Sequence, residues 1–312
     1  MTRRARITAG AFVLSILAAA AATARPDADW DRCRGSDAPD VVIAACGAVI
    51  AAGATNERLA VAHHNRGVAH QLQGARGLAV RDYDEAIRRD PGVADSHYNR
   101  GLVHALDGRH DRALADFDRA IALDPAVAVF YDDRGQSHFA RGAYDLALAD
   151  YDRALAIDPD DARFHSDRGN ARYMKGDLAG ALADYDRAIA LKADYAFAYN
   201  NRCWVRTVAG RAEEALRDCD ESLRLAPGTA HGLGSRALAH LALGRASMAR
   251  TDIEAALRAG PEDGQRHYVR GMVLLAQALP DDAARAFAEA RRLAPPGMFE
   301  RWERELGPLR KP

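Results

Sequence analysis

The chain has 312 residues, of which 48% are hydrophobic, and a formal net charge of −1 at pH 7. The apolar content is sufficient for a folded core. The near-neutral charge excludes a general electrostatic attraction to nucleic acid or to an anionic membrane surface.

The first 24 residues have the pattern of a secretory signal peptide. Arg3 and Arg4 precede an apolar stretch over residues 7–22, and small residues at Ala22 and Ala24 suit a signal peptidase. The alternative is a membrane anchor, but the stretch is shorter than the roughly 18 apolar residues of a stable span. We therefore expect cleavage near Ala24, no stable membrane span in the mature chain, and a periplasmic or secreted bacterial protein.

A 34-residue pattern then repeats seven times over residues 60–297. Alanine fills one position of every copy: Ala79, Ala113, Ala147, Ala181, Ala215, Ala249 and Ala283. A fixed period of this length is typical of a solenoid, whose units are too small to bury their apolar faces alone. Each unit is predicted to form two helices, because glycine recurs after the first apolar stripe and proline after the second. The glycines are Gly74, Gly108, Gly142, Gly176, Gly210 and Gly244, and the prolines are Pro91, Pro125, Pro159, Pro227, Pro261 and Pro295.

This pattern resembles the tetratricopeptide repeat (TPR), which has a small residue at unit position 8, alanine at 20 and 27, an aromatic at 24 and proline at 32. Position 24 holds Tyr83, Phe117, Tyr151, Tyr185, Cys219, Ile253 and Phe287. The resemblance covers about three quarters of the chain. It implies an all-α fold, a right-handed superhelix of paired helices in which the first helix of each pair lines a concave groove.

Both ends of the array are predicted to be capped. The register extends backward, with Cys33 at position 8 and Ala45 at position 20, so residues 25–59 are interpreted as a degenerate N-terminal capping repeat. Residues 298–312 are interpreted as a capping helix and tail, in which Phe299 and Trp302 cover the last unit.

The resemblance assigns a peptide-binding groove to positions 2, 5, 6, 9, 12 and 13 of the first helices. The candidates are Asp95, Tyr98, Asn99, Asp132, Asp133, Gln136, Phe139, Asp167, Asn170, Tyr173, Asn201 and Trp204, with Ser166, Phe197, Asn200 and Tyr268 at further such positions. Aromatic rings offer apolar contact and amides can bond an extended backbone. The carboxylates favour a basic or mixed peptide over an acidic one. The alternative is that many of these aromatics only fill gaps between units.

Four cysteines fall into two local pairs, which favours disulfides in an oxidising compartment. In an antiparallel helix pair with its turn near position 15, facing positions sum to about 28 to 30 because both helices rise equally per residue. Cys33 and Cys46, at positions 8 and 21, fit this rule. Cys203 and Cys219, at 8 and 24, are about one turn out of step, which argues for Cα atoms beyond the bridging limit of about 7 Å. Against this, they replace the glycine and the tyrosine of other repeats, an exchange of volume that indicates neighbouring positions, so this bridge is left open. For both pairs the alternative is two buried free thiols.

Arginine fills position 7 of every unit, and aspartate fills position 23 of the first six. The arginines are Arg66, Arg100, Arg134, Arg168, Arg202, Arg236 and Arg270, and the aspartates are Asp82, Asp116, Asp150, Asp184, Asp218 and Asp252. Positions 7 and 23 satisfy the facing sum, so we predict an ion pair within each unit. The alternative is an anion-binding arginine strip. In the last unit Ala286 faces Arg270, which leaves that arginine for another partner.

No motif for catalysis, a metal or a cofactor occurs in the sequence. It lacks a phosphate-binding glycine loop, a GxSxG and an HExxH motif, and the histidines sharing position 11 lie on successive helices, too far apart for one ion. We therefore expect a non-enzymatic scaffold that presents its groove to a protein or peptide segment in the cell envelope. The alternative is a structural module that self-associates through its terminal units.

Overall fold

The computed structural model describes residues 26–35 and 37–309. All regular elements in this part of the chain are helical. They are α1 (Pro26–Arg34), α2 (Pro39–Ala51), α3 (Asn56–Leu72), α4 (Arg76–Arg89), α5 (Ala94–Leu106), α6 (His110–Leu123), α7 (Ala128–Ala140), α8 (Tyr144–Ile157), α9 (Ala162–Met174), α10 (Leu178–Leu191), α11 (Ala196–Val208), α12 (Ala212–Leu225), α13 (Ala230–Ala242), α14 (Ala246–Ala259), α15 (Gly264–Ala276), α16 (Pro280–Leu293), α17 (Met298–Leu306) and a 3-10 turn, η1 (Gly307–Leu309). The predicted signal peptide lies outside the described residues.

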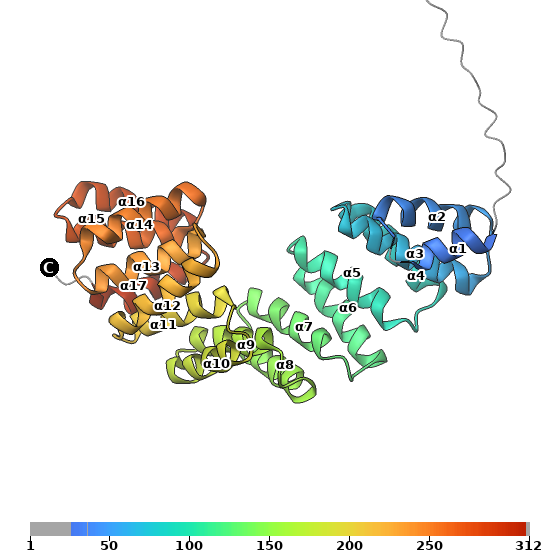
Figure 1. The fold of residues 1–312 in the computed structure, drawn as a ribbon, viewed down its shortest axis with the longest axis horizontal. Coiled ribbons are helices and arrows are strands. Elements are labelled where there is room, and N and C mark those ends of the chain that lie inside the picture. Colours follow the sequence, from blue (N-terminus) through green and yellow to red (C-terminus); the bar gives the residue numbers. More distant parts are fainter. Residues whose placement is uncertain (1–25, 36, 310–312) are drawn as a thin grey trace, which may run out of the picture. The chain divides into compact units, whose positions relative to one another are not determined.

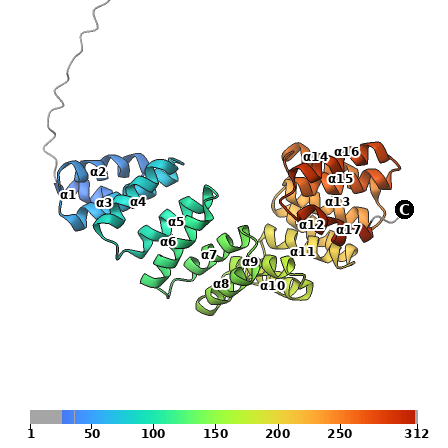
Figure 2. The same ribbon diagram turned by 180° about the vertical axis from the view of Figure 1, so that it is seen from behind.

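Contacts divide the chain into two compact units, one ending at Val103 and the other beginning at His104. The first contains α1 to α4 and most of α5, and the second contains α6 to α17 (Figures 1 and 2). In the second unit α7 packs on α8, α9 on α10, α11 on α12, α13 on α14 and α15 on α16. The odd-numbered helices from α7 to α15 also contact one another in succession. The predicted all-α solenoid of helix pairs is confirmed.

A glycine packed under an aromatic ring brings the two helices of a pair together. A Cβ atom on Gly169 of α9 would lie 2.7 Å from Cε1 of Tyr185 on α10, well inside van der Waals contact. The same close approach occurs between Gly135 and Tyr151. Glycine is also required at the turn that follows, because Gly176 has a φ of +85°. These two positions explain why small residues recur with the period of the array.

We expect Gly169→Ala to destabilise the protein by about 1–3 kcal/mol, since the added methyl group must displace the Tyr185 ring in a packed core. Urea unfolding followed by circular dichroism measures the change. The matched control is Gly77→Ala in α4, where a Cβ atom meets no neighbour within 4 Å. That control is expected to be neutral or slightly stabilising. Equal effects at the two sites would contradict the assigned contact.

At the N-terminal side, α1 and α2 occupy the residues interpreted as a degenerate repeat. Cys33 and Cys46 lie in a cluster of buried apolar residues with Val42 and Val49. The array is joined to this pair of helices by Asn65 of α3, whose Nδ2 donates to the Cys33 carbonyl at 3.0 Å.

At the C-terminal end, α17 packs on the last helix pair. Phe299 and Trp302 are both buried, and their rings lie 5.5 and 5.9 Å from the ring of Tyr268 on α15. Tyr268 is therefore a core residue with no exposed surface, not a groove residue. Figures 1 and 2 both place α17 beside α13, and residues of these helices share one apolar cluster.

Candidate binding groove

The first helices of the second unit enclose a cavity of about 190 Å³. Residues from α7, α9, α11, α13 and α15 line it. Six predicted groove residues are among them: Phe139, Asn170, Tyr173, Asn200, Asn201 and Trp204. The lining residues that the sequence analysis missed include His231, Ser235, Asp263 and Arg266. His231 and Ser235 hold positions 2 and 6 of the sixth repeat, which the groove assignment covers, but no candidate was named in that repeat. Asp263 and Arg266 hold positions 34 and 3, which the assignment does not cover.

Asparagine side chains form a connected row across the cavity. Asn170 Oδ1 accepts hydrogen bonds from Asn201 Nδ2 and from the Tyr185 hydroxyl, each at 2.9 Å. Asn200 Nδ2 donates to Asn201 Oδ1 at 3.2 Å, which leaves the buried Asn200 Oδ1 without a partner among the described residues. A buried acceptor in this state costs free energy unless a donor reaches it. The row can therefore bond the N–H groups of an extended backbone.

The aromatic residues of the cavity are engaged by the C-terminal helix. Trp204 Nε1 donates to the Tyr173 hydroxyl at 2.8 Å, and that hydroxyl donates to Glu305 Oε2 of α17 at 2.6 Å. Burial raises the pKa of Tyr173, so the hydroxyl keeps its proton at neutral pH. The sequence analysis placed α17 over the last unit but did not predict that it reaches α9.

An acidic cluster lies beside the cavity, where α7 faces α9. Gln136 Nε2 donates to Asp132 Oδ2 at 2.9 Å and to Asp167 Oδ2 at 3.3 Å. Asp132 is only 2% exposed, and its Oδ1 has no partner among the described residues. Burial and the neighbouring charges of Asp167 and Asp133 raise the pKa of Asp132 to about 8. Asp132 is therefore a buried carboxyl group rather than an exposed groove residue as the sequence suggested.

We expect Asp132→Asn to stabilise the protein increasingly as the pH rises. A carboxyl whose folded-state pKa lies above its unfolded value holds its proton more tightly when folded, so stability falls as pH rises between about 4 and 8. An amide does not titrate, so the substitution removes this loss of stability. We expect the free energy of unfolding to rise by about 2 kcal/mol or more at pH 8 and to change little near pH 4. Thermal unfolding across this pH range measures it. The control is Asp194→Asn at an exposed site. An effect of Asp132→Asn that does not vary with pH would contradict the raised pKa of Asp132.

The first unit contains the remaining predicted groove residues, Asp95, Tyr98 and Asn99, all on α5. Asp95 lines a separate cavity of about 390 Å³ together with His64 of α3. His64 Nδ1 lies 2.9 Å from the Ser96 hydroxyl. Burial lowers the pKa of His64 despite the charge of Asp95, which keeps the imidazole neutral at pH 7.

Four of the arginines at position 7 each join two carboxylates. In Arg134, Nε and Nη2 donate to Asp150 of the same repeat at 2.9 and 2.5 Å, and Nη1 donates to Asp118 of the preceding repeat at 2.7 Å. The same two contacts occur at Arg168, Arg202 and Arg236. We call this series the arginine ladder. The sequence analysis had identified only one of the two acids.

For the other arginines of the ladder, one of the two contacts is described. Arg66 donates to Asp82 at 2.9 and 2.7 Å, and Arg100 donates to Asp84 at 2.7 Å. Arg100 and Asp116 belong to different compact units, so their pairing stays a prediction. Arg270, which faces Ala286 in its own repeat, has another partner: its Nε donates to Glu254 of the preceding repeat at 3.0 Å. Available carboxylates thus engage these arginines, which argues against an anion-binding strip.

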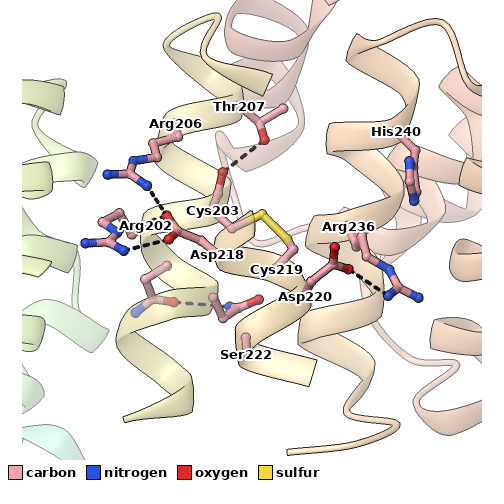
Figure 3. The surroundings of a disulfide bond; sticks show 12 residues. Arg202, Cys203, Arg206, Thr207, Asp218, Cys219, Asp220, Ser222, Arg236 and His240 are labelled. Atoms are coloured by element: carbon pink, nitrogen blue, oxygen red, sulfur yellow. Dashed lines mark hydrogen bonds and ion pairs between the residues drawn. A yellow bond between two sulfur atoms is a disulfide. The ribbon is translucent and has the colours of Figure 1, made fainter. Parts of the chain in front are cut away.

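Both cysteine pairs are bridged. The Cα atoms of Cys33 and Cys46 lie 4.7 Å apart. Those of Cys203 and Cys219 lie 5.4 Å apart, so the one-turn offset does not carry them beyond the bridging limit, and the exchange of volume was the better guide. Figure 3 shows this disulfide between α11 and α12, next to the pairs that Asp218 forms with Arg202 and Arg206. Its two positions are those of the glycine and the aromatic residue in other repeats, where the helices approach most closely.

Family models match the chain over three stretches. A model described as TPR repeat matches residues 135–176, and one described as Tetratricopeptide repeat matches residues 64–128 and 235–297. Together these stretches cover more than half of the chain. The chain belongs to the tetratricopeptide repeat family. In a TPR array the first helix of each pair lines the concave surface, and the 190 Å³ cavity is lined mainly by first helices.

Solved TPR structures share this fold. A tetratricopeptide repeat protein from Parabacteroides merdae is 19% identical with a TM-score of 0.64, over 80% of this chain and 97% of that one. A chain of the APC/C hetero-tetramer Cut9–Hcn1 is 18% identical with a TM-score of 0.61, over 78% of this chain and 49% of that one. PilF of Pseudomonas aeruginosa is 19% identical with a TM-score of 0.54, over 68% and 97%. No curated protein matches the chain.

Among residues 26–35 and 37–309, no group of three or more His, Cys, Asp or Glu side chains is placed to hold a metal ion. No helix in the same ranges combines the length and apolar character that crossing a membrane requires.

Proposed function

We propose that this TPR protein is a non-enzymatic scaffold of the cell envelope that binds a protein or peptide segment on its concave surface. The observation that carries this proposal is the cavity crossed by Asn170, Asn200 and Asn201. Amides in a row can match the alternating donors and acceptors of an extended backbone, and the surrounding rings supply apolar contact. A buried acceptor on Asn200 that lacks a donor within the described chain favours a ligand over a purely structural role.

A basic or mixed segment fits this surface better than an acidic one. The charges of Asp133 and Asp167 are part of what raises the pKa of the buried Asp132. A lysine or arginine of a ligand would offset these charges. An acidic segment would add to them.

A location outside the cytosol is supported by the two disulfides and by the signal-like sequence of the first 24 residues. The contact of Cys203 with Cys219 replaces the glycine–aromatic contact of other repeats, so the bridge takes the place of a packing interaction. Such a substitution favours a compartment in which the bridge persists.

Affinity capture tests the proposal. The disulfide-bonded chain, purified without residues 1–24, is immobilised and exposed to periplasmic extract, beside Asn170→Ala/Asn201→Ala and the outer-surface control Arg119→Ala/Arg153→Ala. We expect a partner that the parent and the control retain and the asparagine variant loses. Equal recovery by all three proteins, or recovery by none, would contradict groove binding.

Self-association through the terminal units is disfavoured by α17. Phe299 and Trp302 cover α15, so the apolar surface of the last repeat is already buried. The mass measured by light scattering is therefore expected to stay constant between micromolar and near-millimolar concentrations. A mass that rises with concentration would favour the self-assembling alternative.

A further inference from the structure

The C-terminal helix lies on the same surface that the proposed function assigns to the ligand. It packs on α15, the first helix of the seventh repeat, and also reaches α9, the first helix of the fourth repeat. We propose that α17 is an intramolecular ligand of the concave surface, and that this surface takes an amphipathic helix of the same chemistry from a partner, in exchange for α17. This inference rests on the proposed function and specifies the class of partner.

The apolar face of α17 indicates which apolar residues a partner helix must present. Phe299, Trp302 and Leu306 follow at helical spacing and are 5%, 4% and 0% exposed. They belong to one apolar cluster with residues of α11, α13 and α15, which includes Val205, Leu238 and Val269. A helix that presents large apolar residues at i, i+3 and i+7 fits the same surface.

Two charged residues fix the position of α17 against α9. Arg301 Nη1 and Nη2 donate to the carbonyl oxygens of Met174 and Tyr173 at 2.6 and 2.9 Å, and its guanidinium lies 4.9 Å from the centre of the Tyr173 ring. Glu305 accepts from the Tyr173 hydroxyl and pairs with Arg301 at 2.7 Å. Carbonyls at a helix C-terminus lack intrahelical donors and carry partial negative charge, so a cation is favoured there. A partner helix therefore needs an arginine and a carboxylate at i and i+4.

Helix α17 is suited to exchange because few contacts other than those described above hold it in place. It has nine residues, which is too short for stable helix formation in water without tertiary contacts. Its docking is also incomplete, since Trp302 Nε1 and Arg301 Nε are buried without an acceptor among the described residues. Helices of this kind open at low free energy relative to the core of a protein.

A peptide-binding experiment tests the exchange directly. The probe is a fluorescent synthetic peptide with the sequence of residues 296–309. Binding is measured by anisotropy to the full disulfide-bonded chain, to Arg301→Ala/Glu305→Ala, and to Glu303→Ala/Arg304→Ala. The last variant loses one acid and one arginine from the exposed side of the same helix and serves as the matched control.

We expect the Arg301→Ala/Glu305→Ala protein to bind the peptide at least about tenfold more tightly than the parent, because a tethered competitor acts at an effective concentration on the order of millimolar. The control is expected to bind like the parent. Hydrogen exchange supplies a second readout: saturating peptide should remove the protection of the α17 amides in the parent. Unchanged affinity in the Arg301→Ala/Glu305→Ala protein, or α17 amides that stay protected at saturation, would overturn the proposal and leave α17 as a permanent cap.

The result is distinguishable from a failure of the proposed function. If α17 exchanges with the peptide but neither parent nor variant captures a partner from extract, the inference stands and the proposed function fails. If a partner is captured through the asparagine row while the peptide does not exchange, the proposed function stands and the inference fails.

Discussion

Replacement of Arg134 by Met is expected to lower the free energy of unfolding by about 3 kcal/mol. The Asp150 side chain is only 6% exposed and receives two hydrogen bonds from Arg134, so the substitution leaves a buried carboxylate without its main counter-charge. The loss also breaks the bond to Asp118 that links this repeat to the preceding one. Urea unfolding monitored by circular dichroism measures the change.

A double-mutant cycle of Arg134→Met with Asp150→Asn separates the free energy of the interaction between the two side chains from the cost of burying each of them. We expect a coupling free energy of about 2 kcal/mol, since removing both charges relieves the penalty that removing one creates. The matched control is the exposed pair Arg211 and Glu214, whose side chains are 47% and 44% exposed. Exposed pairs of this kind contribute little, and no measurable coupling is expected there. A coupling near zero for the buried pair would show that the arginine ladder does not stabilise the array.

Removal of the Cys203–Cys219 bridge is expected to destabilise the protein by about 3 kcal/mol, the magnitude for a loop near its 16-residue separation. The double variant Cys203→Ala/Cys219→Ala loses both the bridge and the side-chain contact at this position. Thermal unfolding with and without reductant measures the effect. Reductant should affect the parent more than the variant, in which only the Cys33–Cys46 bridge remains to be reduced.

The repeat itself offers a rescue for this position. The variant Cys203→Gly/Cys219→Tyr restores the pair seen at Gly135 and Tyr151, where the ring lies 2.8 Å from the place of a Cβ atom. We expect it to recover much of the lost stability in reducing conditions. If this variant is no more stable than the alanine variant, the interpretation of the bridge as a replacement for the glycine–aromatic contact is wrong.

Local rules were sufficient to predict the fold and one contact of the arginine ladder. The period specifies helix pairs, and the equal rise of antiparallel helices places position 7 opposite position 23, as Arg134 and Asp150 show. The contact of Arg134 with Asp118 was missed because it depends on how one repeat stacks on the next. Stacking is set by packing between units and does not follow from spacing within a unit.

The same rule did not decide whether Cys203 and Cys219 are bridged. It treats the two helices as parallel rods at constant separation, whereas glycine at position 8 lets the helices approach there. Two small residues at the closest approach bring the Cα atoms within 5.4 Å although the positions differ by a turn in register.

The groove was predicted only in part, because no candidate was named in the sixth repeat, where His231 and Ser235 hold groove positions. Asn170, Tyr173, Asn201 and Trp204 meet in one cavity as the TPR pattern implies. The contact of α17 with Tyr173 joins residues that are 132 apart in sequence, and no local pattern predicts a contact over that separation. In retrospect, Arg301 and Glu305 at i and i+4 on an otherwise amphipathic helix were the available signal.

Photo-crosslinking in living cells tests the central claim most directly. Phe197 on α11 is 64% exposed and is replaced by the photo-reactive benzoyl-phenylalanine. The control is the same replacement at Met248, which is 55% exposed on α14, the second helix of its repeat. The account predicts a discrete adduct from position 197 and none from position 248. Adducts from position 248 alone, or from neither position, would contradict a scaffold that binds its partner on the concave surface.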